Sequence, residues 1–327
     1  MRLVVVGVGA IGGSLAVRLV QAGHEVVAVA RGEHLERIRA EGLRLRTPEE
    51  DVVVPLEAVG GVDEVGERGV DAVLVTTKSQ DTAGVAHALA GSALARRPVV
   101  CAQNGVRNED VVAGAGLAAY GALVMMPAAH LRPGEVQAYS SPTVGMVDVG
   151  VWPSGTDDVA AGVADALRSA GVDSRTVADI ARWKYRKLLV NLGNAVTALC
   201  GRSAPVGVLL ERAEDEGRAV LDAAGIDYAS AEEDATRRGR TLQVRSIGDE
   251  ERAGSSTWQS LARATGDSEV DELNGQIVRL GARVGAPTPV NATLARLVAE
   301  AARTRRGPGL MTVGEVLAQV EEASSAV

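Results

Sequence analysis

The sequence predicts an α/β N-terminal domain with a mostly parallel, doubly wound sheet, followed by an all-α C-terminal domain. Short Val-rich runs alternate with helical segments in the first half, and a glycine-rich turn follows the first run. After Ala178 there is almost no strand signal, only long helical stretches. We therefore expect the domain boundary between residues 1–177 and 178–327, with no Pro/Gly/Ser-rich linker.

Composition narrows the class of protein. Of 327 residues, 46% are apolar and none is phenylalanine, so Val, Leu and Ala must form the core, which suits buried parallel strands. A net charge of −8 argues against a nucleic-acid or anionic-membrane partner. Cys101 and Cys200 lie in apolar runs and are expected to be buried free thiols. The four histidines show no metal-ligand spacing, so no metal site is expected.

The N-terminal segment begins with a positive charge and an apolar run, as signal peptides do. Glycines interrupt this run from Gly7 onward, and no clean small-residue cleavage site follows. No other window reaches the ~18 uninterrupted apolar residues that a membrane span needs. We therefore expect a soluble cytoplasmic protein.

The first glycine-rich turn lies between a strand and a helix. Residues 2–6 (RLVVV) and 24–30 (HEVVAVA) are typical of buried strands, and residues 14–23 between them have helical spacing with a glycine stop. The turn has the pattern G-x-G-x-x-G, which lets backbone approach a pyrophosphate at a helix N-terminus. In this βαβ context it predicts a Rossmann-type dinucleotide site rather than an ordinary turn. The loop residues of this site are Gly7, Gly9, Ala10, Ile11 and Gly12.

The residue after the second strand indicates the cofactor. Sites that prefer NAD usually carry an Asp or Glu there, which bonds the ribose 2′-hydroxyl. This chain has Arg31 at that place, and an arginine favours the 2′-phosphate of NADP(H). A surface arginine is the alternative, and Glu33 close by leaves NAD open.

Polar residues follow the next two predicted strands, residues 71–77 and 97–102, which flank an Ala-rich helix. Lys78 follows the first strand and Asn104 the second. Ligands of open parallel sheets bind outside the carboxyl ends of the strands. We therefore expect Lys78 to meet a phosphate or ribose and Asn104 to reach the nicotinamide end, although Asn104–Gly105 alone would be typical of a plain turn.

The remaining elements complete the two domains. Residues 119–126 predict a strand, 133–150 an antiparallel extension and 155–171 a helix, and a last strand is expected to end near Val177. In the second half, the sequence RTRRGPG at 303–309 ends the last strong helix and leaves a modest C-terminal tail.

A helix at the start of the second half carries an unusual polar stripe. Trp183 to Val196 contains Lys184 and Lys187, two of only three lysines in the chain. At ~100° per residue, Asn191 and Asn194 fall within ~40° of Lys187. Uncharged amides are poor helix formers, so this stripe favours a polar cleft over a solvated face. The opposite side is apolar and consists of Leu188, Leu189, Leu192, Val196 and Leu199.

Taken in order, the motifs GVGAIGG, ARG, TTK, QNG, KYRKLLVNLGNAVTAL and EVDELNG resemble the ketopantoate reductase (2-dehydropantoate 2-reductase) family over nearly the whole chain. The resemblance implies a Rossmann domain and a helical domain with the active site between them. It also implies reduction of the 2-keto group of ketopantoate by NADPH to give pantoate, on the route to pantothenate and coenzyme A.

The resemblance also assigns roles. It implies that Lys187 is the general acid and Glu269 an active-site carboxylate, although EVDELNG alone would favour a solvated glutamate. Arg31 and Lys78 match cofactor-contacting positions. The positions that match substrate contacts are Asn104 (near the nicotinamide as well), Asn191, Asn194 and Ser256, with Ser255 as the alternative to Ser256. Lys184 lies at the edge of the stripe and is expected to be a rim or solvated residue.

Two departures lie on the substrate side. Asn191 and Asn194 are three residues apart, whereas better-known members space them by four, and CGRSAPV after this helix offers Ser203 but no asparagine. The helix is therefore expected to be one residue short or locally distorted. Reduction of another branched 2-keto acid and a non-catalytic NADP(H)-binding sensor remain alternatives, while a 3-hydroxy acid dehydrogenase fits EVDELNG poorly. The sequence leaves the oligomeric state open, with a homodimer as one option.

Overall fold

The computed structural model describes residues 1–66, 68–239, 241–250, 254–264 and 266–325. The chain forms two compact units: Met1–Lys184 with Ala231–Arg252, and Tyr185–Ser230 with Ala253–Val327. The sequence predicted a single division, between residues 177 and 178. The chain instead passes between the two units three times, because residues 231–252 return to the first unit.

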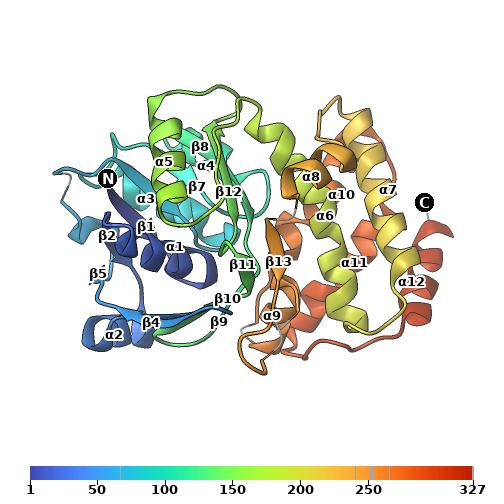
Figure 1. The fold of residues 1–327 in the computed structure, drawn as a ribbon. Coiled ribbons are helices and arrows are strands. Elements are labelled where there is room, and N and C mark those ends of the chain that lie inside the picture. The colour runs from blue at the N-terminus through green and yellow to red at the C-terminus, as the bar shows by residue number, and fades with distance from the viewer. Residues whose placement is uncertain (67, 240, 251–253, 265, 326–327) are drawn as a thin grey trace. The chain divides into compact units, whose positions relative to one another are not determined.

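The first unit is built on a seven-stranded sheet of order β12-β8-β7-β6-β1-β2-β5 (Figure 1). All neighbours are parallel except β12 and β8, which pair antiparallel. This confirms the predicted, mostly parallel Rossmann-type sheet. Its strands are β1 (Arg2–Val6), β2 (Glu25–Val29), β5 (Glu57–Val59), β6 (Ala72–Val75), β7 (Val99–Cys101), β8 (Ala119–Met125) and β12 (Met146–Val151).

Helices cover both faces of this sheet. Leu3 and Val5 of β1 pack in one core with α1 (Ala10–Gln21) and α5 (Asp158–Ser169). Val4 and Val6 point into a second core with α3 (Thr82–Ala90) and α4 (Asn108–Gly114). Because alternate residues of a strand face opposite sides and both sides are covered, the strands are continuous valine-rich runs.

The strand order reverses at β1. The chain goes from β1 to β2 on one side and later returns to place β6 on the other side of β1. A crevice forms at such a switch point, outside the carboxyl ends of the strands. The glycine-rich turn after β1 and Lys78 after β6 both lie at this place.

A second sheet, of order β4-β3-β10-β9, was only partly anticipated as an antiparallel extension. Its strands are β3 (Leu43–Arg46), β4 (Asp51–Val54), β9 (Ala128–Arg132) and β10 (Glu135–Ala138), and α2 (Gly32–Glu41) precedes β3. The expected last strand ending near Val177 is wrong. Within the described residues, only isolated bridges form there, Met146 with Asp173 and Val149 with Thr176.

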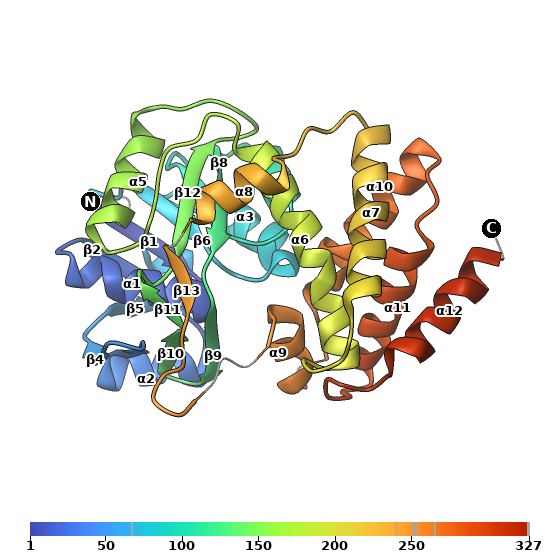
Figure 2. The ribbon, with the colours of Figure 1, turned by 45° about the vertical axis from the view of Figure 1, so that its right-hand side comes forward.

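The returning segment contains α8 (Ala231–Arg238) and β13 (Leu242–Val244). β13 pairs antiparallel with β11 (Ser140–Pro142), as Figure 2 shows. Arg237 of α8 donates to Asp148, at 2.7 Å from Nε, and to Asp173, at 2.9 Å from Nη1. Asp148 is fully buried, so this ion-paired arginine ties the segment to the edge strand β12. No local pattern predicts such a return, since it depends on a pairing some 90 residues apart.

The second unit is helical. Its elements are most of α6 (Ile180–Cys200), with α7 (Gly207–Ala223), α9 (Ser256–Ala262), the short 3-10 helix η3 (Glu269–Glu272), α10 (Asn274–Val284), α11 (Pro289–Arg303) and α12 (Val313–Ser325). The predicted apolar side of α6 is confirmed, since all five of its Leu and Val residues are at most 1% exposed. α11 ends at Arg303 as expected, but the tail beyond it forms α12, with Val316 and Val320 buried. No helix in the described ranges is both long and apolar enough to cross a membrane.

Candidate active site

The glycine-rich turn packs tightly against the end of β6. Gly7 has φ +93°, and a Cβ there would lie 2.6 Å from Thr77 Cγ2 and 2.9 Å from Thr77 N. A Cβ on Gly12 would collide with Thr76 Oγ1 and with the Gly7 carbonyl oxygen. Thr76 Oγ1 donates to that same carbonyl at 2.7 Å. The first and third glycines are therefore required by the fold itself.

Gly9 is different. Its φ of −74° is open to any residue, and a Cβ there would meet nothing closer than His130 Nδ1 at 3.7 Å. Packing within the protein thus gives no reason for glycine at this position. α1 begins at Ala10 with no acidic residue in its first turn, so its positive dipole end is not neutralised locally. Ala10 and Ile11 are the first two residues of α1. A helix N-terminus of this kind is suited to holding a phosphate group through its backbone N–H groups.

Two histidines lie close to this loop, although the sequence suggested that the histidines are scattered. Their ring centroids are 4.3 Å apart, although His34 is on α2 and His130 on β9. His34 Nε2 donates to the Val8 carbonyl at 2.8 Å, and Gly134 N donates to His34 Nδ1 at 2.8 Å. These bonds fit the neutral ring, and burial lowers the pKa of His34. No cluster of metal-ligating residues forms in the described part of the chain.

Arg31 lies just after β2 and precedes the first residue of α2. Its side chain is exposed. The nearby Glu33 faces Arg37, at 3.9 Å from its Nε. Arg31 therefore lies just after the second strand, at the position where Rossmann-type folds carry the residue that contacts the ribose of a dinucleotide.

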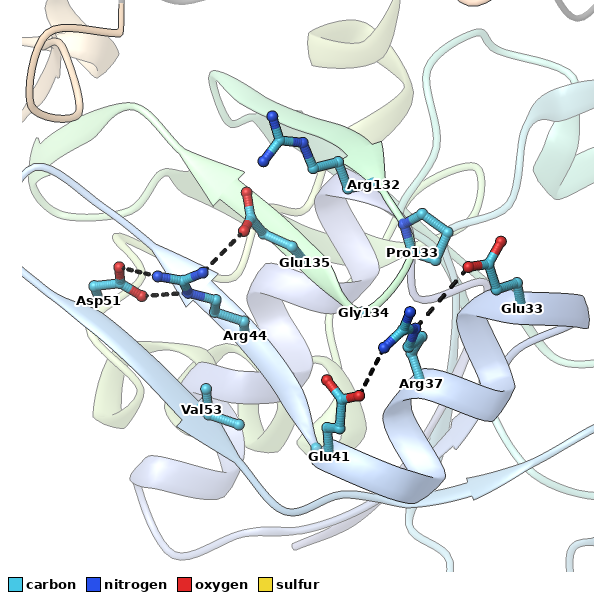
Figure 3. Close-up of a pocket in the computed structure, with 11 residues that line it drawn as sticks. Glu33, Arg37, Glu41, Arg44, Asp51, Val53, Arg132, Pro133, Gly134 and Glu135 are labelled. Carbon is cyan, nitrogen blue, oxygen red and sulfur yellow. Dashed lines mark hydrogen bonds and ion pairs between the residues drawn. The ribbon is translucent and has the colours of Figure 1, made fainter.

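A cavity of about 840 Å³ opens elsewhere on the first unit, between α2 and the small second sheet (Figure 3). None of the predicted site residues lines it. Two of its arginines are engaged by carboxylates, Arg37 by Glu41 at 2.7 Å and Arg44 by Asp51 at 2.6 Å. We interpret it as a mixed-charge surface hollow rather than as part of the active site.

Lys78 and Asn104 lie at the ends of neighbouring strands, as expected. Lys78 directly precedes the 3-10 helix η2 (Ser79–Asp81), and Asn104 follows β7 by three residues. Ser79 Oγ donates to the Asn104 carbonyl at 3.0 Å, so the two loops are joined. The structure therefore brings the Lys78 loop and the Asn104 loop together at the carboxyl edge of the sheet.

Lys184 is not the rim or solvated residue that the sequence analysis expected. It is 3% exposed, and its ammonium lies 2.5 Å from Glu109 Oε1. It also donates to the carbonyls of Gln103 and Ala122. The expectation was wrong because Glu109 lies 75 positions earlier in the chain, where no helical pattern could relate it to Lys184. The signal that was available is the rarity of lysine in this sequence.

Lys187, Asn191 and Asn194 share α6 within the second unit. Asn191 is 5% exposed, and the other two are partly buried. α6 is a continuous α-helix, so the three-residue spacing of the asparagines is not absorbed by a break. Gly193 between them has a packing reason, because a Cβ there would lie 2.6 Å from Leu210 Cδ2 on α7.

Ser255 and Ser256 are distinguished by α9. Ser255 caps this helix, accepting from Trp258 N at 3.3 Å, and its hydroxyl donates to the Asn194 carbonyl at 3.5 Å. Ser256 is the first residue of the helix and is partly buried. The hydroxyl of Ser255 is therefore used within the fold, so Ser256 is the better candidate of the two for a contact with a ligand.

Glu269 begins η3 and is partly buried. Its carboxylate interacts electrostatically with Arg263, which the sequence analysis did not single out. The thiols of Cys101 and Cys200 are free, as expected, but only Cys101 is fully buried. Burial raises the pKa of Cys101 well above its usual range, so neither its position nor its chemistry suits a nucleophile.

Known proteins match both halves of the chain. Family models described as "Ketopantoate reductase PanE/ApbA" and "Ketopantoate reductase PanE/ApbA C terminal" match residues 3–151 and 179–302. The 2-dehydropantoate 2-reductase of Halobacterium salinarum is 32% identical over 321 residues, which cover 93% of this chain and 99% of that protein. The chain belongs to the ketopantoate reductase family. The protein of the same name from Archaeoglobus fulgidus is 32% identical, over 91% of this chain and 96% of the relative.

Solved structures agree. A PanE/ApbA family ketopantoate reductase from Ralstonia eutropha has 30% identity and a TM-score of 0.78, over 93% of this chain and 99% of that one. D-mandelate dehydrogenase, solved with NADH and anilino(oxo)acetate, has a TM-score of 0.79 over the same shares at 23% identity, and so shares the fold. Membership of the ketopantoate reductase family makes this protein an oxidoreductase with a small-molecule substrate.

Proposed function

We propose that the protein reduces 2-dehydropantoate (ketopantoate) to (R)-pantoate with NADPH, in pantothenate and coenzyme A biosynthesis, and that Lys187 is the general acid. The polar stripe of α6 carries this proposal. Its leucine side is fully buried, whereas Lys187 keeps partial exposure beside two asparagines. A helix that needed only a solvated face would not place amides there.

The chemistry requires a proton donor at the keto oxygen. Bound NADPH would supply the hydride that the keto carbon accepts. Negative charge then grows on the oxygen, and Lys187 Nζ stabilises it and donates the proton. A lysine ammonium can release that proton near neutral pH, whereas a guanidinium cannot. Solvent then restores the proton on Lys187.

The remaining residues of the second unit would hold the substrate. The amides of Asn191 and Asn194 can both donate and accept, which suits the hydroxyl and keto oxygens of a small acid. Ser256 would donate to the substrate carboxylate. Glu269 would orient Lys187 and accept from the substrate hydroxyl.

The first unit supports the cofactor assignment. Packing does not require glycine at position 9, and the first turn of α1 contains no acidic residue. The pyrophosphate would lie on Gly7 to Gly12, and Arg31 would pair with the 2′-phosphate that distinguishes NADPH from NADH. Lys78 and Asn104 would contact the ribose and nicotinamide ends.

The test is the oxidation of NADPH, followed by absorbance, with ketopantoate and a panel of other 2-keto acids, and with NADH in parallel. We expect turnover with ketopantoate and NADPH. Lys187→Ala should lower kcat by about 100-fold or more, the usual contribution of a general acid, and leave the Kd of NADPH within about twofold. Turnover that survives this change would contradict the proposal.

A different branched 2-keto acid is the second candidate, and one observation favours it. Asn194 lies three residues from Asn191 in an unbroken helix, and a spacing of four would turn the second amide by ~100°. Activity on another 2-keto acid but none on ketopantoate would support this candidate. Tight NADPH binding without turnover on the whole panel would instead support a non-catalytic sensor.

A further inference from the structure

The ammonium of Lys184 is held by three elements of the first unit. It lies 2.5 Å from Glu109 Oε1 on α4, 3.0 Å from the carbonyl of Gln103 after β7, and 3.3 Å from the carbonyl of Ala122 on β8. Lys184 is 3% exposed and Glu109 is fully buried. Three acceptor oxygens therefore surround the buried ammonium, as many as it has N–H groups.

The Gln103 carbonyl belongs to the peptide that leads into Asn104. On the other side of that residue, the Asn104 carbonyl accepts from Asn108 Nδ2 at 2.7 Å and from Ser79 Oγ at 3.0 Å. The backbone is thus fixed by hydrogen bonds both before and after the Asn104 side chain. Lys184 supplies the bond on the upstream side.

The side chain of Gln103 extends the same network toward β6. Its Nε2 donates to the Thr77 carbonyl at 2.8 Å and to Thr82 Oγ1 at 2.9 Å. Thr82 Oγ1 in turn donates to Asn108 Oδ1 at 2.8 Å. The loops that carry Lys78 and Asn104 are therefore parts of one buried polar network, and Lys184 is its cation.

Stability alone is a poor reason for this arrangement. Replacing a buried ion pair by apolar residues of similar volume is often neutral or stabilising, because desolvation of the charges offsets their attraction. An apolar pair could fill the space but could not donate to the Gln103 carbonyl. Burial also raises the pKa of Glu109, and the Lys184 ammonium opposes this shift. Keeping Glu109 ionised in this buried place therefore costs free energy.

We propose that Lys184 is a positioning residue for the reaction: with Glu109 as its counter-ion, it fixes the peptide before Asn104 and thereby the direction of the Asn104 side chain. The inference rests on the proposed function, because that function gives Asn104 its contact with nicotinamide and substrate. Lysine suits this place because the three donors of a compact ammonium can rotate toward acceptors from three elements, whereas the donors of the larger guanidinium are fixed in one plane.

The test is a mutant cycle between this pair and Asn104. Lys184→Met combined with Glu109→Leu removes both charges, so no unpaired charge stays buried. We expect the double variant to melt within a few degrees of wild type, while kcat falls about tenfold or more, as misplacement of a catalytic group produces. In the Asn104→Ala background, the same double change should lower kcat no further, because the two act through one group.

A matched control replaces a second ion pair on the same helix. Arg182 of α6 pairs with Glu233 of α8 at 2.8 Å, and both side chains are more exposed than those of Lys184 and Glu109. Arg182→Met with Glu233→Leu removes the same number of charges, and we expect its kcat to stay within about twofold of wild type. An equal loss of kcat in the control would show a general effect of losing charge and would overturn the proposal.

Two further results would also test the positioning role of Lys184. A folded Lys184→Met/Glu109→Leu variant with wild-type kcat, or a loss that adds fully to that of Asn104→Ala, would overturn the positioning role. If that variant does not fold, Lys184→Met with Glu109→Gln removes both charges and the donor to the Gln103 carbonyl while position 109 stays polar, and the same tenfold loss is expected. Failure of the proposed function is seen separately, as wild type without turnover or Asn104→Ala without any kinetic defect.

Discussion

Two lysines one turn apart on α6 show how differently one helix can use the same side chain. Lys184 is 3% exposed, and its ammonium donates to backbone carbonyls and faces a buried carboxylate. Lys187 is only partly buried and shares the polar stripe with Asn191 and Asn194. The first lysine has the surroundings of a fixed structural cation, and the second has the partial exposure that the proposed general acid needs. Burial and partners, rather than residue type, separate the two roles.

The glycine-rich turn repeats this contrast. A Cβ on Gly12 would collide with the backbone of Gly7, so the fold requires glycine there. Gly9 has an ordinary φ and space for a Cβ, so packing does not require its glycine, whereas the proposed phosphate contact would. In both pairs, the residue that is less tightly packed is the one to which the proposed function assigns binding or chemistry.

The largest effect on stability is expected at Lys184. Lys184→Met alone should lower the free energy of unfolding by about 3–5 kcal/mol, because it leaves the Glu109 carboxylate buried and unpaired. Denaturant titration of the single variant and of Lys184→Met/Glu109→Leu measures this, and the double variant should recover most of the loss. An unchanged free energy in the single variant would mean that Glu109 is not charged against Lys184.

The next largest effects are expected at Gly12 and Gly9, where substitution should affect stability and NADPH binding, respectively. Gly12→Ala should cost about 1–3 kcal/mol or more, because overpacking at this turn forces the backbone to shift. Gly9→Ala should leave the melting temperature nearly unchanged but weaken NADPH binding by about tenfold, because its methyl group occupies the approach to the pyrophosphate. Thermal melts and fluorescence titration with NADPH measure the two effects. Equal NADPH affinity in Gly9→Ala and wild type would place the pyrophosphate elsewhere.

A smaller and more selective change is expected at Arg31. Arg31→Ala removes a charge-assisted contact worth about 1.5–3 kcal/mol, so the Kd of NADPH should rise by about tenfold or more. The Kd of NADH, which has no 2′-phosphate, should change by less than about twofold. Parallel titrations with both cofactors measure the ratio, and an equal loss for both would remove Arg31 from cofactor discrimination.

Local patterns in the sequence predicted much of the fold, because they follow from short-range rules. The run of valines at β1, the glycine-rich turn and the leucine side of α6 all depend on periodicity and on glycine. The return of residues 231–252 to the first unit escaped prediction, since it depends on Arg237 meeting Asp148, 89 positions away. The burial of Lys184 escaped for the same reason, because its partner Glu109 lies on another element.

The candidate site divides in the same way. Gly7, Lys78 and Asn104 could be located from sequence because the carboxyl ends of parallel strands share one edge of a sheet. The roles of Glu269 and Ser256 followed from resemblance, and the structure adds a reason to prefer Ser256, because Ser255 caps α9. The contact between His34 and His130 joins positions 34 and 130, and no spacing rule could have found it.

Under the proposed function, position 187 is a lysine because the reaction needs a proton there. The most direct measurement is kcat of Lys187→Arg with saturating NADPH and ketopantoate, since arginine keeps the positive charge but holds its proton. We predict a loss of about 100-fold or more with NADPH affinity unchanged within about twofold. A Lys187→Arg enzyme with kcat within about twofold of wild type would contradict the claim.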